Sequence, residues 1–142
     1  MYKKILIALD NSPADNGIIA HVAELAARFG SKILLLHVAD GFAARCFESL
    51  KLAESDEMKA DHNYLETTAS DLRAKNLSVE IKLALGNPPT EIVKAAEGEG
   101  CDLIALAGHG HKLFGDIFHG STITEVRHKT EIPLLVVRAK KK

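Results

Sequence analysis

The stretch from residue 107 to residue 122 has the residue types of an anion-binding loop. Its glycines, at positions 108, 110, 115 and 120, allow a backbone to approach a ligand closely. The end of the stretch, Gly120-Ser121-Thr122, is expected to open a helix, where free amide donors, two hydroxyls and the helix dipole favour a phosphate. The chain contains neither a Walker A sequence nor a GxGxxG fingerprint. The stretch therefore predicts a phosphate site of another kind, with an ordinary glycine-rich connection before a capped helix as the alternative interpretation.

Asp10 is a second candidate, because it ends an apolar run at residues 5–9 and precedes the turn-forming residues 11–13. Two roles are open for its carboxylate: it caps the following turn, or it contacts a ligand directly or through a cation. Negative charge beside a triphosphate is unfavourable unless a cation lies between them. The second role is therefore compatible with a bound Mg²⁺ or Mn²⁺ ion.

Histidines and cysteines offer further chemistry. His109, His111 and His119 lie in the same loop stretch, and three imidazoles could ligate zinc, but their spacing matches no established zinc pattern. We interpret them as loop histidines that face solvent or touch phosphate. His37 lies inside an apolar run and is expected to be a core residue with satisfied ring nitrogens, and Cys101 is expected to pack rather than react.

The elements that must position these residues follow from apolar periodicity. Continuous or alternating apolar runs predict strands at 5–9, 32–38, 78–85, 102–107 and 133–138. Helices are expected from Pro13 to Phe29, over 54–75, from the turn at 86–89 to the glycines at 98–100, and from 120 onward. Successive strand–helix units predict a single-domain α/β fold with a doubly wound, mostly parallel five-stranded sheet and four helices. In such a sheet the ligand crevice lies beyond the carboxyl ends of the strands.

Composition sets the class of protein. The 142 residues are 46% hydrophobic and 26% charged, with a net charge of -1, which predicts one domain over residues 1–142 and disfavours nucleic acid as a partner. No apolar run approaches the about 20 residues of a membrane span. With only two cysteines, a reducing, cytoplasmic location is expected.

Three segments resemble the universal stress protein family, and the resemblance covers nearly the whole sequence. Residues 3–12 (KKILIALDNS) match its KKILVALDGS-like start, and residues 86–92 match the G-x-P-x-x-x-I segment that its members have near the middle of their sequences. Gly110, nine intervening residues and then Gly120-Ser121 reproduce the second half of the G-x-x-G-x9-G-S/T pattern of its nucleotide-binding subgroup. The first glycine of that pattern falls on Ala107.

The resemblance implies a flavodoxin-like fold, also described as adenine nucleotide alpha hydrolase-like, with strand order 3-2-1-4-5. It further implies a dimer with ATP or AMP at the carboxyl ends of the strands. Carried over by position, the residues that flank the nucleotide after the first strand are Ala8, Leu9 and Asp10, and Val38 contacts adenine. The residues that line the adenine–ribose side and the ribose–phosphate region are Leu106, Ala107, His109 and Gly110, and those that hold phosphate are Gly120, Ser121 and Thr122.

Ala107 departs from the family pattern. If its position requires a positive φ, the Cβ costs on the order of 1 kcal/mol and weakens nucleotide affinity. If φ is negative, the methyl group only narrows the pocket.

The leading hypothesis is an ATP- or AMP-binding regulatory or sensor dimer of the stress response, acting in the cytoplasm on an unknown protein partner. Its apolar terminal strand, 133–138, is expected to pair with a second copy, because an exposed sheet edge must be covered or paired. Phosphoryl transfer needs charge stabilisation, and the loop offers only Lys112 as a nearby cation, so at most slow ATP hydrolysis is expected. Two alternatives stay open: a metal-assisted ATP hydrolase using Asp10 and the loop histidines, and a nucleotide-free dimeric interaction module whose pocket is blocked by Ala107.

Overall fold

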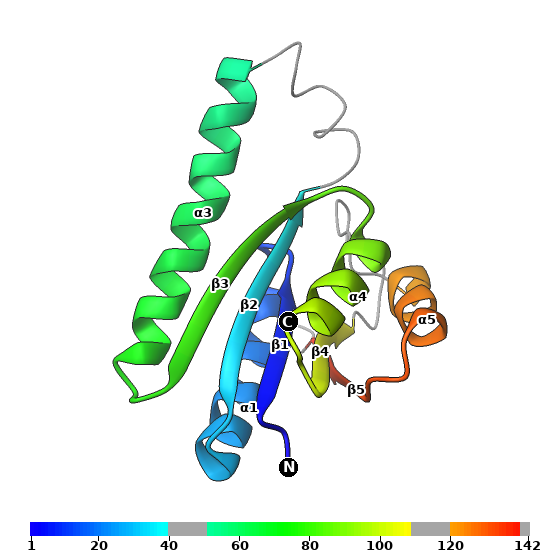
Figure 1. Cartoon of the computed structure of the whole chain (residues 1–142). Coiled ribbons are helices and arrows are strands. Elements are labelled where there is room, and N and C mark those ends of the chain that lie inside the picture. The colour runs from blue at the N-terminus through cyan, green and yellow to red at the C-terminus, as the bar shows by residue number, and fades with distance from the viewer. Residues whose placement is uncertain (40–50, 109–119, 140–142) are drawn as a thin grey trace.

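The computed structural model of the chain describes residues 1–39, 51–108 and 120–139, and all structural statements below concern these residues (Figure 1). Five parallel strands form one sheet in the described part, in the order β3-β2-β1-β4-β5. The strands are β1 (Lys4–Leu9), β2 (Lys32–Ala39), β3 (Ser78–Leu85), β4 (Leu103–Gly108) and β5 (Leu134–Arg138). The helices are α1 (Ala14–Phe29), α3 (Lys51–Arg73), α4 (Pro88–Gly98) and α5 (Gly120–Lys129). The predicted fold class and strand order are confirmed.

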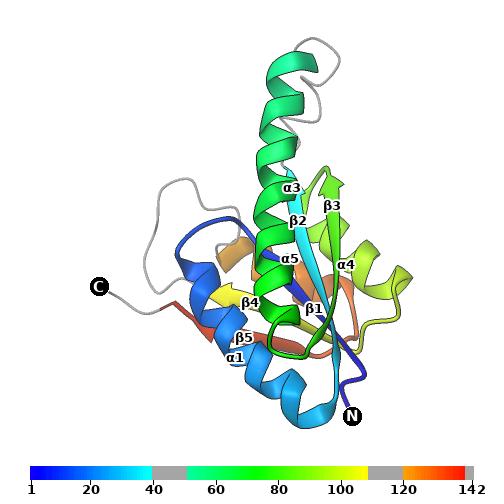
Figure 2. The same ribbon diagram turned by 90° about the vertical axis from the view of Figure 1, so that its left-hand side faces the viewer.

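Side chains on the two faces of the sheet build two separate cores. Successive residues of a strand point to opposite faces, so Ile5, Ile7 and Leu9 of β1 pack under α1 and α3, whereas Leu6 and Ala8 pack under α4 and α5. Figure 2 shows α1 and α3 on one side of the sheet and α4 and α5 on the other. All five of these β1 side chains are fully buried, as expected for the central strand of a doubly wound sheet.

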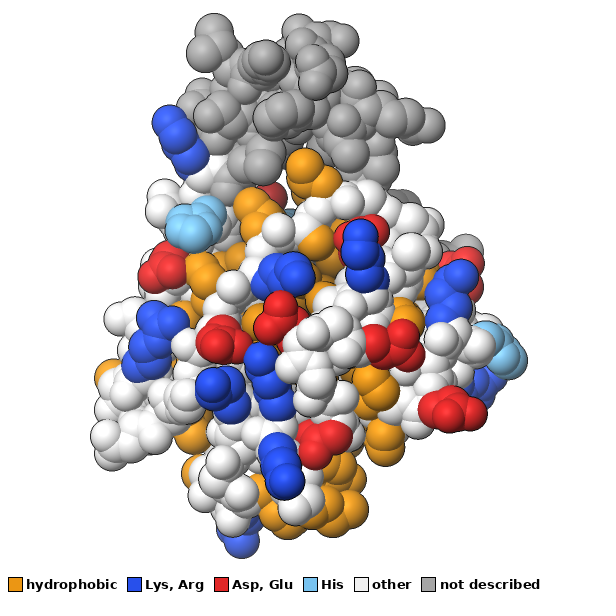
Figure 3. Space-filling view, viewed as in Figure 1, with side chains coloured by type: hydrophobic (Ala, Val, Ile, Leu, Met, Phe, Trp, Pro, Cys, Tyr) orange, Lys and Arg blue, Asp and Glu red, His pale blue; other side chains and the backbone are white. Residues whose placement is uncertain are grey.

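The strand at the β3 edge differs from the central strands because its face on the α4 side is charged. Lys4 Nζ lies 2.8 Å from Glu80 Oε1 and 3.3 Å from Glu99 Oε1. Lys82 Nζ lies 3.6 Å from Glu99 Oε2, and Lys32 Nζ lies 3.8 Å from Glu80 Oε2. Figure 3 shows these two charge types intermixed across that face. This charged face agrees with the alternation of polar and apolar residues by which the strand at 78–85 was predicted.

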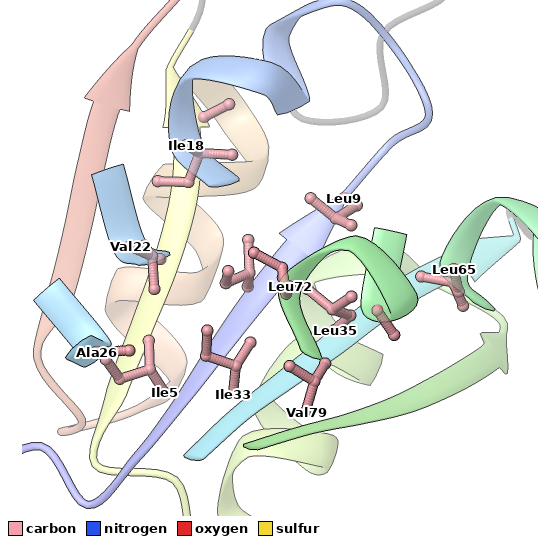
Figure 4. Close-up of a cluster of buried hydrophobic side chains, with 14 of the residues drawn as sticks. Ile5, Leu9, Ile18, Val22, Ala26, Ile33, Leu35, Leu65, Leu72 and Val79 are labelled. Carbon is pink, nitrogen blue, oxygen red and sulfur yellow. The ribbon is translucent and has the colours of Figure 1, made fainter. Parts of the chain in front are cut away.

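Helix ends agree with the sequence prediction to within a few residues. The helix α1 begins at Ala14, one residue later than predicted, and the Ser12 hydroxyl accepts a hydrogen bond of 3.3 Å from the Ala14 amide. Gly30 ends this helix with a φ of 67°, a left-handed conformation that favours glycine. The helix α3 begins at Lys51, three residues earlier than predicted. Its side chains Leu65 and Leu72 are buried against the sheet (Figure 4).

Candidate functional site

Helix N-termini gather at the carboxyl edge of the sheet. The helix α4 begins directly after β3, where the Gly86 amide donates 2.9 Å to the Ala39 carbonyl at the end of β2. Asn87 caps that helix, its side-chain oxygen accepting from the Thr90 amide at 3.2 Å. The first turn of α5 lies at the end of β4, since a Cβ built on Gly108 would be 3.9 Å from Ile123 Cδ1. Together with the start of α1 after β1, these N-termini make this edge favourable for an anion.

A buried carboxylate holds the turn that leaves β1. Asp15, only 1% exposed, accepts from the Asp10 amide at 3.2 Å through Oδ1 and from the Asn11 amide at 2.8 Å through Oδ2. The hydroxyl of Tyr64, on α3, also donates to Asp15 Oδ2. Asn11 adopts a φ of 60°, a left-handed conformation that asparagine tolerates. The turn from Leu9 to Asn11 is therefore held by hydrogen bonds to Asp15 of α1, which Tyr64 of α3 supports in turn.

The electrostatics of Asp15 follow from this burial. Desolvation, with a smaller contribution from the neighbouring Asp10 carboxylate, raises the pKa of Asp15 to about 6, against the opposing effect of the hydrogen bonds from Tyr64 and the Asp10 amide. Burial and the adjacent carboxylates raise the pKa of Tyr64, so its phenol stays protonated and donates. Both carboxylate oxygens of Asp10 are themselves shielded from solvent.

His37 provides a second polar contact at the same place. Its Nδ1 lies 2.9 Å from the Leu9 carbonyl oxygen, and its Nε2 lies 3.3 Å from Asp61 Oδ2 on α3. The residue is 7% exposed, which confirms a buried histidine with partners for both ring nitrogens.

Three members of this cluster were not predicted from the sequence: Asp15, Tyr64 and Asp61. Asp15 has the position of an ordinary acidic residue in a first helical turn, and Asp61 and Tyr64 lie in a mostly polar helix. A sequence signal did exist for α3, because Asp61, Tyr64 and Leu65 share one helix face. That signal identifies the packed face but not the contacts that it makes.

The predicted strand-end residues lie together at the carboxyl edge, with their side chains in the two cores. Ala8, Val38 and Leu106 belong to the core under α4 and α5, and Leu9 and Ala107 belong to the core under α1 and α3. All five are at most 2% exposed.

Ala107 is an ordinary strand residue. It lies within β4, and it is absent from the described residues with positive φ, which are Tyr2, Asn11 and Asn76 among the non-glycines. Of the two cases considered for Ala107, the one with negative φ applies, so its methyl group imposes no backbone strain.

Gly108 has a packing role. A Cβ at this position would lie 2.7 Å from Val136 Cγ1, so the glycine allows β5 to approach the end of β4. This glycine is explained by a neighbouring strand without any ligand.

The phosphate-holding residues are described only in part. Gly120 begins α5 and Ser121 follows it, while Thr122 is 4% exposed in the first turn. His109 and Gly110 lie outside the described residues, as do His111 and His119 of the zinc alternative.

Neither metal nor thiol chemistry is supported within the part of the chain that the structure describes. No group of three or more His, Cys, Asp or Glu residues there could hold a metal ion. Cys101 is buried, and desolvation raises the pKa of its thiol to about 11, so it stays protonated at neutral pH, as its predicted packing role requires. Across residues 1–39, 51–108 and 120–139, no helix has the length and apolar character needed to span a membrane.

A family model and the similar proteins found by sequence point to the same family. Residues 1–138 match the family model described as the universal stress protein family. The universal stress protein MJ0577 of Methanocaldococcus jannaschii is 32% identical over 160 residues, which cover 99% of this chain and 97% of the relative. Its solved structure superimposes with a TM-score of 0.83 at 30% identity and covers 100% of this chain and 99% of that one.

Two more distant solved structures share the fold and contain adenine nucleotides. A universal stress protein from Archaeoglobus fulgidus in complex with dAMP has a TM-score of 0.67 at 22% identity, covering 96% of this chain and 98% of that one. Another universal stress protein, in complex with cAMP, has a TM-score of 0.67 at 16% identity and covers 98% of both chains.

Proposed function

Since the chain belongs to the universal stress protein family, we propose that it binds an adenine nucleotide, ATP or AMP, at the carboxyl edge of its sheet. The observation that carries the proposal is that two proteins with this fold hold dAMP and cAMP. The N-termini of α1, α4 and α5 at this edge support it, because their dipoles and free amides favour a phosphate. We further propose that the protein acts in the cytoplasm as a regulatory component of the stress response.

In this proposal the residues 8–10, Val38 and 106–107 surround the base and ribose through their backbone. His109 and Gly110 continue this lining, and Gly120, Ser121 and Thr122 hold phosphate at the start of α5. The strand-end side chains are buried in the core, so backbone shape rather than side-chain polarity selects the base. A Mg²⁺ or Mn²⁺ ion bound with the nucleotide would be detected as a difference in affinity with and without the metal.

Titration calorimetry with ATP and AMP tests the proposal on the purified protein. Gly120→Val should weaken binding at least tenfold, because its side chain would intrude where phosphate meets the helix amides. Ser121→Ala should have a smaller effect, since the backbone donors remain. Gly98→Val is the matched control, because Gly98 lies near the end of α4 and a Cβ there meets nothing within 4 Å.

The outcomes of this experiment are distinct. Mass spectrometry of nucleotide released on denaturation, and ADP production over time, separate stable binding from slow hydrolysis. No binding of either nucleotide by the wild-type protein contradicts the proposal and favours a nucleotide-free interaction module.

We also propose that β5 pairs with β5 of a second copy across a two-fold axis. The strand lies at one end of the sheet order, and Val136 on it is 46% exposed. An exposed apolar edge strand is a template for pairing. Val136→Lys should shift the molecular mass measured by light scattering from dimer to monomer. Leu85→Lys is the matched control, because Leu85 is 37% exposed on the opposite edge strand, and a dimer that survives Val136→Lys contradicts this interface.

A further inference from the structure

Two chains of polar contacts, each called a relay below, connect side chains of α3 to the same short piece of backbone. In the first, Asp61 contacts His37 Nε2 at 3.3 Å, and His37 Nδ1 contacts the Leu9 carbonyl at 2.9 Å. In the second, the Tyr64 hydroxyl donates to Asp15, and Asp15 accepts the amides of the two residues that follow Leu9. The relays therefore end on three consecutive residues, 9–11.

The two starting points form one surface of α3. Asp61 and Tyr64 are three residues apart and so lie on the same helix face, next to the fully buried Leu65. Leu65 anchors this face against the sheet, which holds both polar side chains at a fixed height above the strand ends. This part of α3 is therefore joined to the region of residues 9–11 by apolar packing as well as by polar contacts.

The His37 relay is charge-assisted in its doubly protonated form. The Leu9 carbonyl and the Asp61 carboxylate are both acceptors, and an imidazole ring donates to both only when it carries two protons. In that form His37 and Asp61 are an ion pair, and hydrogen bonds between ionised groups are about twice as strong as neutral ones. With one proton, the ring donates to only one of the two.

The contacts restrain the backbone on both sides of the Asp10 side chain. The Leu9 carbonyl, the Asp10 amide and the Asn11 amide all point to partners on the α1 and α3 side of the sheet. Fixing these three groups sets the path of the backbone where it leaves β1. That path matters because the backbone of residues 8–10 lines the proposed nucleotide site.

We propose that Asp61 and Tyr64 of α3 are positioning residues for the nucleotide site, acting through His37 and Asp15 on the backbone of residues 9–11. The inference rests on the proposed nucleotide binding and adds to it a named set of residues outside the ligand's reach. It gives the polar face of α3 a role in ligand affinity as well as in stability.

The first part of the test needs no nucleotide. In two-dimensional NMR spectra of the ¹⁵N-labelled protein, the Asp10 and Asn11 amide signals should follow the titration of Asp15, which accepts both. Tyr64→Phe removes a hydrogen bond that lowers the pKa of Asp15, so the midpoint of this titration should move upward, by about half a pH unit to one unit. Besides Tyr64, the titratable group that faces Asp15 is Asp10, which is unchanged in this variant. A midpoint that does not move would show that Tyr64 does not act on residues 10 and 11 through Asp15. The affinity measurement then separates positioning from a contribution to stability alone.

The second part measures ATP affinity by calorimetry. Tyr64→Phe and Asp61→Ala should each weaken binding about threefold to tenfold, the range expected for the loss of one ordinary hydrogen bond. Asp61→Asn keeps an acceptor for His37 and should recover most of the affinity lost in Asp61→Ala. The controls are Tyr2→Phe, which lies before β1 at the amino ends of the strands, and Asp71→Ala, which removes an exposed acidic residue of the same helix.

The possible results separate the two proposals. If the wild-type protein binds ATP and both variants bind it equally well, the positioning role is overturned while nucleotide binding stands. An unchanged amide titration in Tyr64→Phe also overturns the positioning role. If the wild-type protein binds no adenine nucleotide, the proposed function fails and the positioning role fails with it.

Discussion

Replacing Asp15 with asparagine should remove a pH-dependent loss of stability from this protein. The carboxyl group is 1% exposed, and its pKa rises from 3.8 to about 6 in the folded state. Between these two values the folded protein binds a proton that the unfolded chain has already released. The free energy of unfolding therefore falls as pH increases through this window.

The size of the effect follows from the shift. About two pKa units correspond to about 3 kcal/mol between the fully protonated and the fully ionised limits, and most of this change falls between about pH 4 and pH 7. Asparagine keeps an oxygen that can accept the Asp10 or Asn11 amide, but it does not ionise. The difference in unfolding free energy between Asp15→Asn and wild type should therefore move in favour of the variant as pH rises.

The assay is urea unfolding followed by far-ultraviolet circular dichroism, because the chain contains no tryptophan. Unfolding curves at several pH values between 4 and 8 give the free energy of each protein. Asp71→Asn is the control, since it removes an exposed carboxylate from the same molecule. A stability difference between Asp15→Asn and wild type that stays constant over the whole pH range would refute the argument.

Two further predictions concern backbone positions near the same edge. Gly108→Ala should lower the free energy of unfolding by about 1–2 kcal/mol, because the new methyl group would lie 2.7 Å from Val136 Cγ1. In a double-mutant cycle measured by chemical denaturation, adding Val136→Ala should restore most of this loss. If Gly108→Ala has the same effect with and without the Val136 side chain, the contact is not the cause. Asn11→Ala should lower the free energy of unfolding by about 1 kcal/mol, because alanine tolerates the φ of 60° poorly. Asn11→Gly should leave it nearly unchanged in the same assay. Equal stabilities of the two variants would be inconsistent with backbone strain at this turn.

The fold was accessible from the sequence because its signals are local. Continuous apolar runs marked β1, β2 and β4, and the alternation in β3 identified an edge-ward strand. The turn at 86–89 and the glycines at 98–100 marked the two ends of α4 for conformational reasons that do not depend on distant parts of the sequence. The order of the strands came from the family resemblance, and the structure agrees with it.

The candidate site was accessible only in outline. Rules for parallel sheets indicate that ligands bind at the carboxyl edge, and the glycine spacing pointed to the loop after β4. The same spacing did not distinguish a glycine near a ligand from one near another strand. Gly108 is of the second kind, because Val136 occupies the space beside it.

The sequence by itself determined where the strands and helices lie and which edge of the sheet collects the helix N-termini, because hydrophobic period and capping act over a few residues. Only the tertiary structure decided that Tyr64 meets Asp15, 49 residues earlier, and that Asp61 meets His37. These partners are brought together by the packing of α3 on the sheet. Burial then makes their hydrogen bonds and charges matter, since a group that water would otherwise solvate must find its partner within the protein.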